Sequence, residues 1–125
     1  MIDHVSIHVT DLGKARDFYV QALAPLGYTM TAEYTEWQVA GFGVGGKADF
    51  WIKADGADQT NHVAFAANDK ASVDAFHAAS IAAGGKDNGS PGYRKEYTPG
   101  YYAAFILDME GHNIEVVFHD PNPSE

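Results

Sequence analysis

A short sequence pattern occurs twice in this chain at a constant offset of 58 residues. Residues identical at that offset include His4 and His62, Val5 and Val63, Asp11 and Asp69, Phe18 and Phe76, and Gly27 and Gly85. Self-similarity of this kind indicates two copies of one supersecondary unit. We therefore expect a single domain over residues 1–125, made of a first module (1–55) and a second module (61–120).

Both copies predict the same order of elements. Ile2–Val9 alternates apolar and polar residues, as a half-buried strand does, and Asn61–Ala67 is expected to be the corresponding strand of the second copy. An aspartate then suits the N-cap of an amphipathic helix, and a glycine can end that helix. Further strands are expected at Tyr28–Glu33, Glu36–Ala40, Ala48–Lys53, Tyr101–Leu107 and Asn113–His119, with a shorter one before Tyr101. The predicted fold class is α+β, with two β-α-β-β-β modules, mixed sheets and helices on the outside.

Two glycine-containing segments require separate interpretation. Gly41–Gly46 does not lead into a helical pattern, so we predict a hairpin turn rather than a phosphate-binding loop. Lys86–Gly100 is long for a connection in a small domain, and it carries Arg94 and Tyr97 just before Tyr101. It suits either a pocket for an anionic or oxygen-rich small molecule or a solvated loop.

Composition excludes several classes of function. The chain has no cysteine, which excludes disulfides, thiolate metal sites and cysteine nucleophiles. Its net charge of −9 disfavours nucleic acid and anionic membranes as partners. No apolar run approaches the roughly 20 residues that span a bilayer, and the first residues lack the features of a signal peptide. A soluble, cytoplasmic protein is expected.

Strand alternation assigns several polar residues to shared faces. His4, Ser6 and His8 share one face of the first strand, and Glu115 shares a face of the last strand with His119. The opposite faces are apolar, so the polar faces are expected to line a cavity. There His4, His62 and Glu115 could bind one divalent metal ion (Zn, Ni, Fe or Mn) with positions open for substrate.

The remaining histidines are interpreted more simply. We expect His77 on a helix surface and His112 in a solvated turn. His8 and His119 could contact a substrate or form hydrogen bonds within the sheet. Together with Tyr102 they are the candidates for a catalytic base beside Glu115.

Two motifs carry a family resemblance. Ala15–Tyr19, with Leu23 and Leu26–Tyr28, forms a helix-to-strand signature, and Asp108–Glu115 forms a turn before a last strand. Both resemble the glyoxalase/bleomycin-resistance/dioxygenase proteins of the vicinal oxygen chelate superfamily, over nearly the whole chain. The resemblance implies that each module curls a four-stranded sheet around a cavity, and that metal ligands lie on the first and last strands.

The ligand set that the resemblance implies carries over to His4, His62 and Glu115. The fourth position aligns with Trp51, and Asp49 could replace it only if the register slipped. Glyoxalase I enzymes have a carboxylate there, so two histidines and one glutamate instead resemble extradiol dioxygenases and fosfomycin-thiol transferases. Trp51 would then be a wall of the substrate pocket, together with Arg94, Tyr97 and Tyr101.

The sequence thus predicts a metal-dependent enzyme acting on a small oxygen-rich molecule, of lyase, dioxygenase or thiol-transferase type. A metal-free binding protein, similar to the antibiotic-sequestering members of the superfamily, is the first alternative. A structural domain with a buried polar network is the second. The resemblance also implies a homodimer whose site takes His4 from one chain and His62 and Glu115 from the other.

Overall fold

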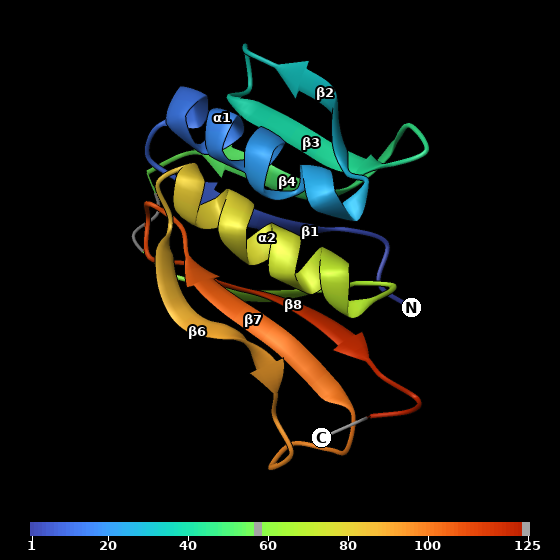
Figure 1. Cartoon of the computed structure of the whole chain (residues 1–125). Helices are drawn as coiled ribbons and strands as arrows, with labels where there is room; N and C mark the ends of the chain where they lie inside the picture. The colour runs from blue at the N-terminus through green and yellow to red at the C-terminus, as the bar shows by residue number, and fades with distance from the viewer. Residues whose placement is uncertain (57–58, 124–125) are drawn as a thin grey trace.

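The computed structural model describes residues 1–56 and 59–123, and it confirms the two β-α-β-β-β modules (Figure 1). The first module comprises β1 (Val5–Val9), α1 (Leu12–Ala22), the 3-10 helix η1 (Ala24–Leu26), β2 (Thr29–Tyr34), β3 (Val39–Val44) and β4 (Lys47–Ala54). The second comprises β5 (His62–Ala66), α2 (Lys70–Ala82), β6 (Lys86–Tyr93), β7 (Tyr101–Leu107) and β8 (Asn113–His119).

Each module forms a mixed four-stranded sheet. The strand orders are β1-β4-β3-β2 and β5-β8-β7-β6, so the first strand of each module pairs in parallel with its last strand. In the first sheet Ser6 lies opposite Trp51, and in the second Ala64 lies opposite Glu115. Because Ser6 and Ala64 are related by the repeat, Trp51 and Glu115 occupy equivalent places. The alignment predicted from the sequence is confirmed.

Both helices begin as the sequence predicts. The carboxylate of Asp11 accepts the Lys14 amide hydrogen at 3.0 Å, and that of Asp69 accepts the Ser72 amide hydrogen at 2.7 Å. These bonds satisfy amides of the first helical turn that lack a partner within the helix. The two helices lie side by side over the same side of the paired sheets (Figure 1). The opposite sheet faces are consequently left uncovered by either helix.

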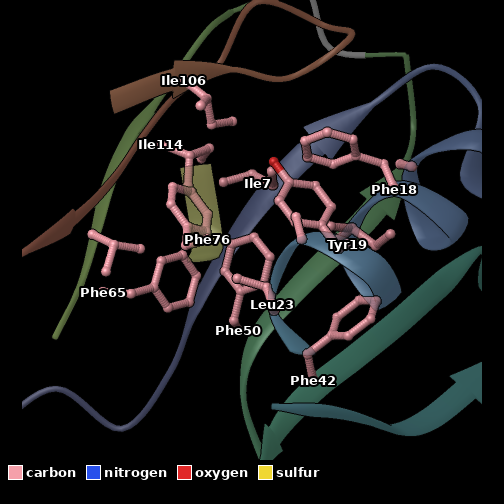
Figure 2. Close-up of a cluster of buried hydrophobic side chains, with 14 of the residues drawn as sticks. Ile7, Phe18, Tyr19, Leu23, Phe42, Phe50, Phe65, Phe76, Ile106 and Ile114 are labelled. Atoms are coloured by element: carbon pink, nitrogen blue, oxygen red, sulfur yellow. The ribbon is translucent and has the colours of Figure 1, made fainter. Parts of the chain in front are cut away.

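An aromatic core joins the modules beneath these helices. Phe18 of α1 and Phe76 of α2 are 1% and 0% exposed, at the matching places that the repeat predicts. The rings of Phe50 on β4 and Phe65 on β5 meet edge to face at 5.1 Å, and Tyr19 packs against Phe50 at 5.1 Å (Figure 2). The two repeats therefore share one hydrophobic core.

The turn between β7 and β8 adds a polar junction to that core. Asp108 accepts the hydroxyl hydrogen of Tyr19 on α1 and the amide hydrogen of His112 at 2.9 Å. The His112 ring accepts the Asn61 amide hydrogen at Nδ1 (2.9 Å) and donates from Nε2 to the His8 carbonyl (2.7 Å). The expectation of a solvated His112 was wrong, because the side chain is 1% exposed and connects the two modules.

Other local predictions also need correction. The predicted strand Glu36–Ala40 is a turn as far as Gln38, and β3 continues through Gly41 to Val44, which leaves only Gly45 and Gly46 in the hairpin turn. Two glycines of β3, Gly41 and Gly43, have no room for a side chain. A Cβ at Gly41 would lie 2.7 Å from the Trp51 ring, and one at Gly43 would lie 1.8 Å from the Lys47 carbonyl oxygen.

The second module differs from prediction in two places. Much of the segment predicted as a long connection forms β6, which pairs with β7 through two register shifts. His77 is only 16% exposed at its side chain, because its Nε2 lies 2.8 Å from the Asp87 carboxylate on β6. It is therefore half-buried rather than a free helix-surface residue. None of the helices in the described residues is long and apolar enough to span a membrane.

Candidate metal half-sites and ligand pocket

The uncovered face of the second sheet gathers several of the predicted site residues. In the antiparallel pairing of β7 and β8, Tyr101 lies opposite His119 and Phe105 lies opposite Glu115. Alternation puts these four side chains on one face, while Tyr102 falls on the helix face. The second module therefore supplies a coherent polar and aromatic surface.

Glu115 is the centre of this surface. Its side chain is buried, at 3% exposure, and Oε1 lies 3.2 Å from Nε2 of His62 on the neighbouring strand β5. The Tyr101 hydroxyl donates to the other carboxylate oxygen, Oε2. Burial, followed by this hydrogen bond to Glu115, raises the pKa of Tyr101 to about 12. Tyr101 thus holds its proton and fixes the orientation of the carboxylate.

The hydrogen-bond partner of His62 Nδ1 determines which nitrogen of the ring carries a hydrogen, and so what can lie between Nε2 and Glu115. Nδ1 lies 2.9 Å from the Asn113 carbonyl oxygen, which can only accept, so Nδ1 carries a hydrogen. In the neutral ring Nε2 is then an acceptor that faces a carboxylate oxygen, which is also an acceptor. Two lone-pair-bearing atoms at this distance are stabilised by a cation between them, either a proton or a metal ion. The donor types fit a divalent transition metal or zinc.

His4 lies apart from this pair within one chain. It precedes β1 with its side chain 56% exposed, and Nδ1 is held by the Asp3 carboxylate at 2.8 Å. Nε2 is therefore the nitrogen available to a metal. His4 lines a hollow of about 230 Å³ that Tyr28 and Val63 also line. Across residues 1–56 and 59–123, no group of three or more His, Asp or Glu side chains could hold a metal within one chain.

The place in the first sheet that corresponds to Glu115 is aromatic. Trp51 lies over Gly41, and its ring stacks on Tyr34 at 6.4 Å with 15° between the planes. The carboxylate of Asp49, two residues before Trp51, accepts the Tyr28 hydroxyl hydrogen at 2.8 Å. Burial and this bond raise the pKa of Tyr28 well above its ordinary value.

A hollow of about 270 Å³ lies on the second sheet, beside two residues that contact His62 (Phe105 and Asn113). Its lining residues are Asn88, Gly89, Arg94, Tyr97, Phe105 and Asn113. The guanidinium of Arg94 lies 5.4 Å from the centroid of the Phe105 ring, and the His62 ring stacks on the same Phe105 at 6.4 Å. Tyr97 meets Tyr101 edge to face at 5.1 Å. The predicted pocket residues of the second module are thus brought together.

The other catalytic candidates occupy different places. His119 packs edge to face at 5.3 Å on Tyr101, whose hydroxyl donates to the Glu115 carboxylate. His8 belongs to the first module, with Nδ1 2.8 Å from Asp55. The Tyr102 hydroxyl donates to Asp74 of α2, so the structure does not bring Tyr102 to the face that carries Glu115.

Two features of this candidate site were missed at the sequence level. Phe105 underlies both His62 and Arg94, and strand alternation from Glu115 across the β7–β8 hairpin could have identified it. The Asn113 carbonyl that fixes the His62 ring has no sequence signal, because every residue carries a backbone carbonyl.

Comparisons with known proteins establish the class. Residues 1–116 match the Glyoxalase/Bleomycin resistance protein/Dioxygenase superfamily, and the chain belongs to that superfamily. A glyoxalase/bleomycin resistance protein from Albidiferax ferrireducens T118 has a similar structure, with TM-score 0.80 and 29% identity over 93% of this chain and 97% of that one.

More distant solved structures share the fold. A lactoylglutathione lyase from Agrobacterium tumefaciens matches with TM-score 0.71 and 23% identity, over 94% of this chain and 92% of that one. A glyoxalase/bleomycin resistance protein/dioxygenase family enzyme from Burkholderia phytofirmans PsJN matches with TM-score 0.69 and 19% identity, over 94% and 98%. No curated protein matches the chain.

Proposed function

We propose that this protein is a metal-dependent enzyme that binds one divalent ion (Zn, Ni, Fe or Mn) through His62 and Glu115 of one chain and His4 of a second copy. The observation that carries the proposal is the pairing of His62 Nε2 with Glu115 Oε1 at 3.2 Å, with Nδ1 already committed to a carbonyl. A His–carboxylate pair of this kind, with the second ring nitrogen anchored, is typical of metal sites.

The need for a second copy follows from the position of His4. Within its own chain, His4 lines a different hollow from the one on the second sheet. Both helices cover one side of the sheets and leave the other side open. A homodimer in which the first module of one copy faces the second module of the other would add His4 to the His62–Glu115 pair. It would also set Trp51 across from Arg94, Tyr97 and Tyr101, which would enclose a small molecule.

The chemistry proposed for this site requires few residues. The bound metal would supply Lewis-acid polarisation of substrate oxygens. Tyr101 holds the Glu115 carboxylate through Oε2, and the Asn113 carbonyl keeps the hydrogen of His62 on Nδ1. Glu115 and His119 are the candidates for moving a proton from their own chain, and His8 is the candidate from the second copy. The fold relationship to a lactoylglutathione lyase supports testing lyase, dioxygenase and thiol-transferase reactions.

Metal binding by matched glutamate variants tests the proposal. Glu115→Gln is nearly isosteric, and it should lower both the metal content after loading and any turnover, while the circular dichroism spectrum is unchanged. Glu36→Gln makes the same change on an exposed carboxylate in the β2–β3 turn and should bind metal like the parent. Turnover is measured with methylglyoxal–thiol adducts, catechols and fosfomycin. Equal metal content in Glu115→Gln and the parent would contradict the proposal.

Oligomeric state provides an independent test. Light scattering should give the mass of a dimer, and His4→Gln should lower metal content without dissociating it. If the protein is a monomer at working concentration, the shared site is excluded.

A metal-free binding protein is the second candidate, and the aromatic first module favours it. Trp51 stands where a fourth ligand would lie, and Tyr34 stacks on it. Such a surface suits a planar ligand held by stacking rather than by coordination. Ligand binding that persists in the presence of a chelator, with no turnover, would favour this candidate.

A further inference from the structure

Arg94 differs from the other arginine of the chain in its partners. Arg16 forms ion pairs with Asp17 and Glu33 at 3.1 and 2.9 Å. Arg94 is half-buried, and within the described residues its guanidinium has no carboxylate within ion-pair distance. In a chain with 17 acidic residues, a half-buried cation without a carboxylate partner is a feature that requires explanation.

Backbone carbonyls hold the guanidinium in place without neutralising it. One terminal nitrogen donates to the Gly92 carbonyl and the other to the Ser90 carbonyl, both at 2.8 Å. The charged plane also lies against the Phe105 ring. Since a guanidinium has five N–H donors, these two bonds leave donors for another group. The side chain is therefore immobilised before any ligand arrives, which lowers the entropy cost of binding.

Arg94 lies near His62, which with Glu115 forms the proposed half of the metal site. It lines the 270 Å³ hollow with Asn88 and Tyr97, and it shares the Phe105 ring with His62. A molecule bound in this hollow lies beside the guanidinium and beside Phe105 and Asn113, which both contact His62. Because the net charge of −9 opposes the approach of anions, this local cation provides the favourable interaction.

We propose that the ligand of this protein is a small organic anion whose carboxylate or phosphonate group is bound by Arg94. This assignment gives the substrate class, and it rests on the proposed function only in that the remaining oxygens of the ligand would lie toward His62 and Glu115. The planar fork of an arginine matches two oxygens of such a group, and charge-assisted bonds of this kind are strong.

Binding of acid and neutral probes to metal-free protein tests the assignment. Benzoate, lactate and methylphosphonate are titrated by NMR against chelator-treated protein, with benzamide and methyl lactate as neutral counterparts. We expect the acids to bind and the neutral probes to bind at least about tenfold more weakly. Comparing benzoate and lactate with methylphosphonate shows which oxyanion is preferred.

Three variants isolate the contribution of Arg94. Arg94→Gln should weaken acid binding about tenfold or more, and Arg94→Lys, which keeps the charge without the fork, should give an intermediate affinity. Lys95→Gln removes the neighbouring exposed cation and should change affinity by no more than about twofold. The dispersion of the NMR spectra shows whether each variant is folded, and Arg94→Lys provides the test if Arg94→Gln is not.

The outcomes separate this inference from the metal proposal. It is overturned if no acid binds, if acids and neutral counterparts bind equally, or if Lys95→Gln weakens binding as much as the Arg94 variants. Metal content is measured in parallel and should be the same in Arg94→Gln and the parent. If the parent binds no metal but acid binding depends on Arg94, the metal proposal fails and the anion site stands.

Discussion

The contact between Tyr19 and Asp108 makes a quantitative prediction for Tyr19→Phe. This change removes only the hydroxyl that α1 donates to the β7–β8 turn, and it retains the ring that packs against Phe50. Tyr19 is 1% exposed and Asp108 is 6% exposed, so the donor is lost at a buried carboxylate. The carboxylate keeps its bonds from two backbone amides, those of Glu110 and His112, both at 2.9 Å.

The expected loss of stability follows from the loss of one donor at a buried charge. Hydrogen bonds to charged groups contribute about 1.5–3 kcal/mol, so we expect Tyr19→Phe to lower the free energy of unfolding by roughly 2 kcal/mol. For a domain of this size that corresponds to a fall in Tm of roughly 6–8 °C. Because the contact joins the modules, the transition should remain a single cooperative step.

Urea unfolding followed by fluorescence and circular dichroism measures this effect. Tyr102→Phe is the matched control, since its hydroxyl donates to Asp74 at the protein surface and should contribute no more than about 0.5–1 kcal/mol. If Tyr19→Phe loses no more stability than Tyr102→Phe, the polar junction does not hold the modules together, and the argument fails.

Two further predictions concern backbone space and the pocket wall. Gly100 and Gly45 have φ values of 83° and 72°, but an added Cβ would lie 2.2 Å from the Asp120 carbonyl oxygen at Gly100 and would meet nothing within 4 Å at Gly45. Gly45→Ala should therefore lower the free energy of unfolding by about 1–2 kcal/mol, and Gly100→Ala should lower it clearly more. Denaturant titration measures both losses, and equal losses would contradict the argument. Trp51→Phe should change the preference among bound ligands and leave the metal content per chain unaltered; a fall in metal content would show that Trp51 supports the metal rather than the ligand.

The parts of the fold that the sequence predicts are those with local signals. The repeated aspartates cap both helices, and strand alternation assigns Glu115 and His119 to one face. Aligning the last strands of the two copies at an offset of 64 rather than 58 residues, because the second module has about six extra residues, was enough to give Trp51 and Glu115 equivalent positions in the repeat. These features depend on period and spacing, which a single sequence records directly.

The parts that it did not predict depend on contacts between distant segments. β6 is rich in glycine and polar residues, and its strand conformation comes from pairing with β7 rather than from its own propensity. His112 is buried by the His8 carbonyl and the Asn61 amide, which lie far away in the sequence. His4 and His62 are related by the repeat but differ in their anchors, which are the Asp3 carboxylate and the Asn113 carbonyl.

The polar junction also fixes an order of events during synthesis. Tyr19 belongs to α1 of the first module, which is synthesised before the second module, and its partner Asp108 is separated from it by 89 positions along the chain. Until that turn emerges, a first module that closes its own sheet through β1 and β4 must bury the Tyr19 hydroxyl unpaired or leave that end of its core open to water. The β7–β8 turn is therefore the segment whose arrival completes the folded unit, and a nascent chain stalled before it would leave the Tyr19 hydroxyl without its partner.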